Sequence, residues 1–321
     1  MTDKPVTVLI PGRIHPRVLE RLEKSFDVVK VAGQGGELEL DEETRTRVRA
    51  VALFGTLQKP WMDMLPNLEI VSNFGVGYDG VDATYAASKG IVVTHTPDVL
   101  NDEVADTTIG LLLNTVRRLP VAEDWLRSGR WKADGPFALS PLSLKGRHVG
   151  LLGLGRIGLE IAQRLEAFKL KISYHTRTPR SDVSYTHFGS LKEMAQAVDT
   201  LICIVPGTAA THKIINADIL SALGPNGVFI NVGRGSSVDE DALAAALRNG
   251  TIAAAGLDVF YQEPTTASDF LGLDNVSLLP HVASASVPTR NAMADLVVDN
   301  LIQWFDHKKV LTPVPETPVN G

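Results

Sequence analysis

The 321-residue sequence contains a single cysteine, Cys203, so no disulfide can form within the chain. Cys203 lies in the apolar run of residues 201–205, and this position predicts a buried strand residue and not a reactive thiol. Such low cysteine content is typical of proteins in a reducing compartment, and we expect the protein to be cytoplasmic.

Further absences limit the class of protein. No apolar stretch reaches the ~18 residues that a membrane-spanning helix needs, and the N-terminal residues lack the hydrophobic segment of a signal peptide. Positive charge is not in excess, since 31 Lys and Arg stand against 37 Asp and Glu and the net charge is −6. This balance predicts no nucleic-acid partner and no binding to membranes.

Apolar residues make up 44% and charged residues 21% of the chain, as in an ordinary globular protein, and the length suggests about two domains. Apolar runs alternate with helical patterns, which predicts parallel α/β folding. In the first hundred residues we expect strands at 6–10, 28–31, 50–54, 68–72 and 91–94, helices at 16–26, 41–49 and 83–88, and a loop at 33–36.

An unusually apolar helix is predicted at 102–118, with Asn101 as its N-cap, and we expect a second subunit to cover part of it. An exposed arm rich in Gly, Pro and Trp follows at 129–146. The alternation then resumes with strands at 149–152, 171–175, 200–205, 227–232, 254–258 and 276–279, and with helices that include 239–248 and 288–306.

The chain is organised around the motif Gly153-x-Gly155-x-x-Gly158, which follows the strand expected at 149–152 and opens a helix. In a dinucleotide-binding turn the first glycine adopts the turn conformation, the second leaves room for a pyrophosphate, and the third lets helix and strand pack closely. The N–H groups at the helix N-terminus then bind the phosphates. The predicted cofactor contacts of this motif are Gly153, Leu154, Gly155, Arg156, Ile157 and Gly158.

The residues after the next strand indicate which dinucleotide is bound. Folds that bind NAD place a carboxylate about 20 positions after the glycine turn, on the ribose 2′-hydroxyl, whereas this sequence has His175 there. The following loop offers hydroxyl and guanidinium groups to a 2′-phosphate, from Thr176, Arg177, Thr178 and Arg180. We predict NADP(H) as the cofactor, with weaker binding of NAD(H); the alternative is an exposed basic loop without a ligand.

Three polar loops follow three C-terminal strands and therefore meet at one edge of a parallel sheet. Their candidate catalytic residues are Arg234, Glu263 and His281. Arg234 can bind the carboxylate of a 2-keto acid through two hydrogen bonds, and His281 can donate a proton to the keto oxygen. Glu263 can fix the tautomer of the imidazole and favour its charged form.

Other interpretations of these loops stay open. Arg234 and His281 can be structural loop residues, and Glu263 can serve the turn at Pro264 alone. Asp258 either binds the nicotinamide carboxamide, as a cofactor contact, or caps a helix. The other histidines have no spacing suited to a metal ion, so we predict no metal site.

Together these motifs resemble those of the D-isomer-specific 2-hydroxyacid dehydrogenases over nearly the whole chain. The matching segments are Asn73-Phe-Gly-Val-Gly-Tyr-Asp79, Gly150 to Gly158, Asn231-Val-Gly-Arg-Gly235, Gly256-Leu-Asp-Val-Phe260, Glu263-Pro264 and Leu279-Pro-His281. Within the family the sequence is most similar to NADPH-dependent glyoxylate/hydroxypyruvate reductases and to hydroxyphenylpyruvate reductases.

The resemblance implies an NADP-dependent enzyme that reduces glyoxylate or hydroxypyruvate to the D-2-hydroxy acid by hydride transfer, with His281 as general acid. One alternative is a hydroxyphenylpyruvate or phenylpyruvate reductase of the same family. A more remote alternative is a non-catalytic nucleotide-sensing protein, since some relatives of this fold act as corepressors.

The resemblance also implies an architecture of two Rossmann-like or flavodoxin-like parallel-sheet domains. Residues 101–286 would form the dinucleotide-binding domain, and 1–100 plus 287–321 a discontinuous substrate-binding domain, with hinges near Asn101 and Pro288. Family members are usually dimers, and in some an arm tryptophan reaches the partner's active site. Trp131 is the candidate here, with Trp125 nearby.

Further site residues are implied by the same resemblance. Val76 and Gly77 would present backbone N–H groups to the substrate carboxylate, and Leu53 is expected near the substrate. Arg234 and His281 would also lie against the cofactor. The remaining expected cofactor contacts are Thr107, Val205, Pro206, Thr211, Val232, Gly233 and Ser284.

Overall fold

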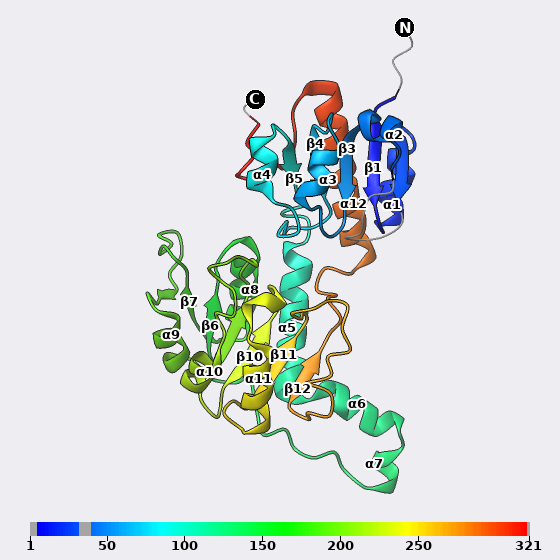
Figure 1. The fold of residues 1–321 in the computed structure, drawn as a ribbon. Helices are drawn as coiled ribbons and strands as arrows, with labels where there is room; N and C mark the ends of the chain where they lie inside the picture. The colour runs from blue at the N-terminus through cyan, green and yellow to red at the C-terminus, as the bar shows by residue number, and fades with distance from the viewer. Residues whose placement is uncertain (1–4, 32–39, 320–321) are drawn as a thin grey trace. The chain divides into compact units, whose positions relative to one another are not determined.

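The computed structural model describes residues 5–31 and 40–319, so the loop expected at 33–36 lies outside the described residues. The chain divides into two compact units, Met1–Leu100 with Ser286–Gly321, and Asn101–Ala285. Each unit is built around its own parallel sheet (Figure 1). The predicted fold class, two parallel-sheet α/β units, is therefore confirmed.

The first unit contains a five-stranded sheet in the order β2-β1-β3-β4-β5, in which all neighbouring strands are parallel. Its strands are β1 (Thr7–Pro11), β2 (Asp27–Val31), β3 (Val48–Leu53), β4 (Ile70–Asn73) and β5 (Val92–Thr94). Its helices are α1 (Pro16–Leu22), α2 (Glu42–Arg47), α3 (Lys59–Met64), α4 (Ala83–Ser88) and α12 (Val287–His307).

Helix α12 completes the first unit although it lies far from the sheet in sequence. It packs against β3 and β4, and the Ser72 hydroxyl donates to the carbonyl oxygen of Val297 at 2.9 Å. On its other side α12 contacts α1, where Arg17 forms an ion pair with Asp295 at 2.7 Å. These contacts explain why the C-terminal segment folds with the N-terminal hundred residues.

The second unit contains a seven-stranded parallel sheet in the order β12-β11-β10-β9-β6-β7-β8. Its strands are β6 (His148–Leu152), β7 (Lys171–His175), β8 (Thr186–His187), β9 (Thr200–Cys203), β10 (Val228–Asn231), β11 (Ala254–Leu257) and β12 (Val276–Leu278). Its helices are α5 (Asn101–Arg117), α6 (Leu119–Arg127), α7 (Arg130–Ala133), α8 (Arg156–Ala167), α9 (Leu191–Ala197), α10 (Ala217–Leu223), α11 (Glu240–Arg248) and the 3-10 turn η1 (Gly235–Ser237).

Two hydrophobic clusters cover the two faces of this sheet. One contains side chains of α9, α10 and α11, including Met194 and Leu243, and the other contains side chains of α5 and α8, including Leu112 and Ile161. The strand order reverses between β6 and β9, because the chain runs from β6 to one edge of the sheet and from β9 to the other. Such a switch point is where parallel α/β sheets bind ligands.

Most predicted elements are present with ends shifted by a few residues. Helices α3 and α7 and strand β8 were not predicted, and the first helix was predicted to reach residue 26, whereas α1 ends at Leu22. Asn101 is the first residue of α5 and not its N-cap. Cys203 is buried in β9, as predicted. Across the described ranges, no helix combines the length and apolar character that crossing a membrane requires.

Candidate active site

The glycine-rich turn joins β6 to α8 at the switch point of the seven-stranded sheet. Gly153 has a φ of 99°, and a Cβ on it would lie 2.9 Å from the carbonyl oxygen of Ile204. A Cβ on Gly158 would lie 2.6 Å from the carbonyl oxygen of Gly153. The first and third glycines are therefore required by the conformation and packing of the turn itself.

Neither the backbone conformation nor the packing of the turn requires a glycine at position 155. Its φ of −77° suits any residue, and a Cβ on it would meet no atom within 4 Å. The open space lies beside the N-terminus of α8, which is 12 residues long and offers free N–H groups to an anion. A glycine at this position is explained by the close approach of a ligand, and the turn fits a dinucleotide pyrophosphate.

The loop after β7 gives its two arginines different environments. Arg180 donates to the carbonyl oxygen of Leu154 at 2.7 Å and forms an ion pair with Asp182. The Thr176 hydroxyl donates to the carbonyl oxygen of Thr178 at 2.7 Å. Arg177 is exposed and makes no hydrogen bond or ion pair within the described residues. Arg180 and Thr176 thus shape the loop, which favours Arg177 as the phosphate ligand.

The loop after β9 is folded around Thr211. Its hydroxyl oxygen accepts from the N–H of Thr208 at 2.9 Å and donates to the carbonyl oxygen of Pro206 at 2.6 Å. Thr107 of α5 donates to the carbonyl oxygen of Ala283 at 3.1 Å. Both threonines are part of the framework of this sheet edge, and their contact with a cofactor stays a prediction.

Arg234 follows β10, and its backbone is held by two side chains. Its carbonyl oxygen accepts from Nδ2 of Asn231 at 3.0 Å and from the Ser237 hydroxyl at 2.6 Å. The glycines on either side allow neighbouring loops to approach, since a Cβ on Gly233 would lie 2.7 Å from the carbonyl oxygen of Val205. A Cβ on Gly235 would lie 1.8 Å from the carbonyl carbon of Phe260. The loops after β9, β10 and β11 therefore fix the base of the Arg234 side chain together.

His281 follows β12 and forms a hydrogen bond with Glu263. The distance from Nδ1 of His281 to Oε2 of Glu263 is 2.5 Å, and Oε1 of Glu263 accepts from the N–H of Phe260 at 2.8 Å. Because an ionised carboxylate can only accept, Nδ1 carries the hydrogen and Nε2 is left for another partner. The side chains of His281 and Glu263 are 47% and 32% exposed, so a small molecule can reach the pair.

Asp258 holds the backbone that carries His281. Its two carboxylate oxygens accept from the N–H groups of Val282 at 2.7 Å and Ala283 at 2.9 Å, and its carbonyl oxygen accepts from the N–H of His281 at 2.8 Å. The residue is completely buried. These contacts favour a positioning role for Asp258 over both roles left open by the sequence, the direct cofactor contact and the helix cap.

The pKa values of the two carboxyl groups at this edge, those of Glu263 and Asp258, are shifted in opposite directions. Burial raises the pKa of Glu263, but the hydrogen bonds from His281 and the Phe260 N–H and the charge of Arg234 outweigh it, so the pKa lies below its usual value. Burial raises the pKa of Asp258, and the backbone N–H groups do not cancel that effect. Glu263 is therefore the ionised partner in its hydrogen bond with Nδ1 of His281.

In the first unit, the loop after β4 is tied down through its carbonyl groups. Nδ2 of Asn73 donates to the carbonyl oxygens of Gly75 and Gly77 at 3.2 and 3.0 Å, and Nδ1 of His95 lies 2.8 Å from the carbonyl oxygen of Val76. Within the described residues, the N–H groups of Val76 and Gly77 have no acceptor. Successive N–H groups of this kind suit the binding of an anion.

The burial of Leu53 does not favour the predicted contact with the substrate, which stays a prediction. Leu53 is the last residue of β3, is 1% exposed, and packs in the hydrophobic core of the first unit. The side-chain alternation of the strand turns it inward, whereas Phe54, the next residue, is 44% exposed.

The two arm tryptophans differ in their contacts. Nε1 of Trp125 donates to the carbonyl oxygen of Gly135 at 3.0 Å, and the Arg130 guanidinium lies 4.5 Å from the centre of its ring. Trp131 on α7 is 62% exposed. Trp125 therefore holds the arm together, and Trp131 is the tryptophan that remains accessible to another molecule.

One cluster was not predicted from the sequence. The ring of Phe74 is parallel to that of His15, with centroids 5.9 Å apart and an angle of 8°, and the guanidinium of Arg290 lies 5.7 Å from the centre of the Phe74 ring. Burial, together with Arg290 and Arg17, lowers the pKa of His15. His15 and Phe74 follow β1 and β4, so strand ends alone indicate that they meet at one edge, but no local pattern brings Arg290 there.

No group of three or more His, Cys, Asp or Glu side chains suited to a metal ion occurs in the described part of the chain. The second unit instead combines a doubly wound parallel sheet, a glycine turn with room for a phosphate, and an accessible His–Glu pair. These features define a dinucleotide-dependent oxidoreductase.

Comparison with known proteins agrees with this class. Residues 109–283 match the family model for the D-isomer specific 2-hydroxyacid dehydrogenase, NAD binding domain. The chain belongs to the D-isomer specific 2-hydroxyacid dehydrogenase family, as the resemblance predicted.

Two relatives and one solved structure illustrate the similarity. A hydroxyphenylpyruvate reductase of Plectranthus scutellarioides is 50% identical over 79% of this chain and 80% of its own length. A glyoxylate/hydroxypyruvate reductase A of Arabidopsis thaliana is 47% identical over 91% of this chain and 94% of its own. The structure is an NADPH-dependent glyoxylate/hydroxypyruvate reductase of Sinorhizobium meliloti in complex with NADP and malonate, with 62% identity, a TM-score of 0.96 and 98% coverage of both chains.

The glycine geometry predicts that Gly155→Ala and Gly158→Ala fail in different ways. Gly155→Ala should keep the thermal stability of the wild type but weaken NADPH binding by at least ~10-fold, because the new methyl group occupies the phosphate space. Gly158→Ala should lower Tm, with a destabilisation of about 1–3 kcal/mol, because its Cβ overlaps the turn. Fluorescence titration with NADPH and thermal melting measure both effects. Unchanged NADPH affinity in Gly155→Ala would contradict this interpretation.

Proposed function

We propose that this protein is an NADPH-dependent reductase that converts a small 2-keto acid, glyoxylate or hydroxypyruvate, into the D-2-hydroxy acid. The observation that carries the proposal is the 2.5 Å hydrogen bond between His281 and Glu263, on the sheet edge that also bears the glycine turn. The Arabidopsis and Sinorhizobium proteins, named as glyoxylate/hydroxypyruvate reductases, support the substrate class.

The proton in this reaction comes from His281. Bound NADPH supplies the hydride that adds to the keto carbon. Nε2 of His281 donates its proton to the keto oxygen, so the carbonyl becomes a hydroxyl group and the imidazole becomes neutral. Glu263 keeps the hydrogen on Nδ1 and stabilises the imidazolium before the transfer. Oxidation of the hydroxy acid uses the same groups in reverse.

The substrate carboxylate is bound by Arg234, and the N–H groups of Val76 and Gly77 give the other unit an anion-binding loop of its own. A guanidinium can bind a carboxylate through two parallel hydrogen bonds and also polarise the neighbouring keto group. The unit of residues 101–285 thus serves as the dinucleotide-binding domain, and the unit that carries Val76 and Gly77 as the substrate-binding domain. The malonate in the Sinorhizobium complex, a small carboxylate, supports a site for this type of anion.

The cofactor is NADP(H), with weaker binding of NAD(H). The glycine turn and the N-terminus of α8 bind the pyrophosphate, and Arg177 with Thr178 binds the 2′-phosphate. His175 stands at the end of β7, where a carboxylate would select NAD(H) by bonding the ribose hydroxyl and repelling the phosphate. The NADP in the Sinorhizobium complex supports this assignment.

The active form is a cytoplasmic homodimer. The arm formed by α6, α7 and the following loop exposes a series of large apolar side chains, namely Leu119, Leu126, Trp131 and Leu139. Leu139 is 94% exposed. Apolar exposure of this extent is typical of a surface that another subunit covers. Trp131 is the residue that would reach the partner's active site.

A second candidate function is the reduction of hydroxyphenylpyruvate. The Plectranthus relative of that name is 50% identical to this chain. The exposed ring of Phe54, in edge contact with Phe74 at 5.7 Å, offers an aromatic surface to such a substrate.

Initial rates with NADPH test the proposed function. The ratio kcat/KM should be higher for hydroxypyruvate and glyoxylate than for 4-hydroxyphenylpyruvate, and chiral analysis should find D-glycerate from hydroxypyruvate. His281→Asn should lose about 10²–10⁴-fold in kcat while still binding NADPH, because only the proton donor is removed. A higher value for 4-hydroxyphenylpyruvate would establish the second candidate, and no turnover of any keto acid would refute the proposed activity.

The two arginines of the loop after β7 should affect cofactor choice differently. Arg177→Ala should raise the KM for NADPH by at least ~10-fold and leave the KM for NADH nearly unchanged, because only NADPH has the 2′-phosphate. Arg180→Ala is the matched control. It should weaken both cofactors, because Arg180 supports the carbonyl of Leu154 in the shared glycine turn. An equal effect of Arg177→Ala on NADPH and NADH would contradict the phosphate role.

A further inference from the structure

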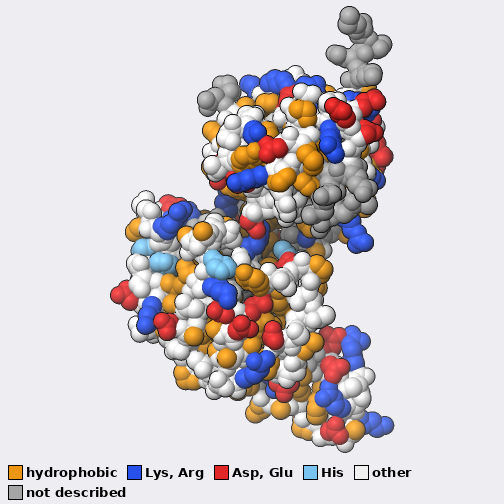
Figure 2. Space-filling view, viewed as in Figure 1, with side chains coloured by type: hydrophobic (Ala, Val, Ile, Leu, Met, Phe, Trp, Pro, Cys, Tyr) orange, Lys and Arg blue, Asp and Glu red, His pale blue; other side chains and the backbone are white. Residues whose placement is uncertain are grey.

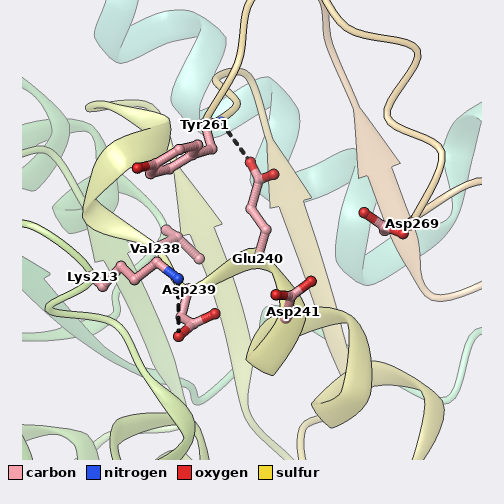
Figure 3. A pocket seen from close by; sticks show the side chains of 7 residues that line it. All are labelled: Lys213, Val238, Asp239, Glu240, Asp241, Tyr261 and Asp269. Atoms are coloured by element: carbon pink, nitrogen blue, oxygen red, sulfur yellow. Dashed lines mark hydrogen bonds and ion pairs between the residues drawn. The ribbon is translucent and has the colours of Figure 1, made fainter.

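A hollow of about 260 Å³ lies beside the loop that carries Glu263. Its lining residues are Lys213, Val238, Asp239, Glu240, Asp241, Tyr261 and Asp269 (Figure 3). Acidic side chains gather over α11 in this part of the surface (Figure 2). No mechanism proposed above uses any of these residues.

Glu240 differs from the other acidic residues of the hollow. Its Oε1 accepts a hydrogen bond from the backbone N–H of Tyr261 at 2.7 Å, marked by a dashed line in Figure 3. Asp239 caps α11 and pairs with Lys213 at 3.4 Å. Asp241 makes no hydrogen bond or ion pair within the described residues. Of these three neighbours along the chain, Glu240 alone bonds to the loop that holds Glu263.

The hydrogen bond of Glu240 is made to the N–H group next to the one that binds Glu263. The adjacent N–H group, that of Phe260, donates to Oε1 of Glu263 at 2.8 Å. The Phe260 carbonyl carbon is also the atom that a Cβ on Gly235 would approach to 1.8 Å. The peptide between Phe260 and Tyr261 is therefore held between the Arg234 loop and Glu240. Any shift of this peptide would change the position of Glu263 against His281.

Glu240 is also electrostatically coupled to the catalytic pair. Burial raises the pKa of Glu240, and the negative charges of Asp269, Asp241 and Glu263 act in the same direction, while the Tyr261 N–H opposes them. The charged groups that face Glu240 thus include Glu263 itself. Those around the pair of Glu263 and His281 are Arg234, Asp258 and Glu240.

We propose that Glu240 is a positioning residue for the proposed reduction: its carboxylate holds the peptide between Phe260 and Tyr261 and thereby fixes Glu263 against His281. The kinetic part of this inference rests on the proposed function. The structural part does not, because the hydrogen bonds exist without substrate.

Three variants test the hydrogen bond of Glu240. Glu240→Gln keeps an oxygen that can accept from the Tyr261 N–H but removes the charge. Glu240→Ala removes both. Asp241→Asn is the matched control, since it removes one negative charge from the same hollow without touching the loop. Each variant is compared with the wild type by thermal melting, by kcat and KM, and by the 15N signals of the His281 ring in 15N-histidine-labelled protein, assigned with His281→Asn.

Glu240→Ala should lower kcat by about 10-fold or more with little change in the KM for NADPH, because Glu263 is misplaced. It should also change the 15N signals of the His281 ring. Glu240→Gln should keep kcat and the ring signals close to the wild type, because its amide oxygen still accepts from the Tyr261 N–H, and so should Asp241→Asn. Wild-type kcat in Glu240→Ala, or an equal loss of kcat in Glu240→Gln and Glu240→Ala, overturns the proposal. The ring signals need no turnover, so failure of the proposed function is distinguishable from failure of this inference.

Discussion

The hydrogen bond between His281 and Glu263 is the interaction on which the chemistry of this protein depends. It joins a loop after β11 to a loop after β12, and both are held by backbone N–H groups: Phe260 on Glu263, and Val282 with Ala283 on Asp258. The parallel sheet brings these loops to one edge, and buried Asp258 and partly buried Glu240 fix their backbones. The orientation of the His281 imidazole therefore depends on the loops after β11 and β12 and on the residues that hold them.

The glycines of the same edge show which parts of the site serve the protein and which serve a ligand. Gly153, Gly158, Gly233 and Gly235 allow the close approach of backbone segments, and a side chain on any of them would overlap a neighbour. Gly155 has neither a positive φ nor a close neighbour. The close approach of a bound pyrophosphate explains a glycine at this position, so this residue links the fold to cofactor binding.

Much of this organisation could be predicted from the sequence, because the spacing of apolar residues, the turn residues and the strand ends are local properties. The glycine turn and the preference for NADP, indicated by His175 in place of a carboxylate, follow from local residue types, and the meeting of Arg234, Glu263 and His281 at one edge follows from parallel strands. The contacts between individual side chains cannot be predicted in this way. The engagement of Arg180 with Asp182 and Leu154, the burial of Leu53, and the contact of Glu240 with Tyr261 depend on tertiary register, which no local pattern encodes.

The pH dependence of kcat/KM for hydroxypyruvate reduction by NADPH, in the wild type and in Glu263→Gln, tests the central claim most directly. The account predicts that the wild-type rate falls as pH rises, because the protonated imidazole is the proton donor. In Glu263→Gln the midpoint of this fall should move to lower pH, because the carboxylate that favours the imidazolium is gone. The same midpoint in both proteins would contradict the claim that Glu263 and His281 act as one acid–base pair.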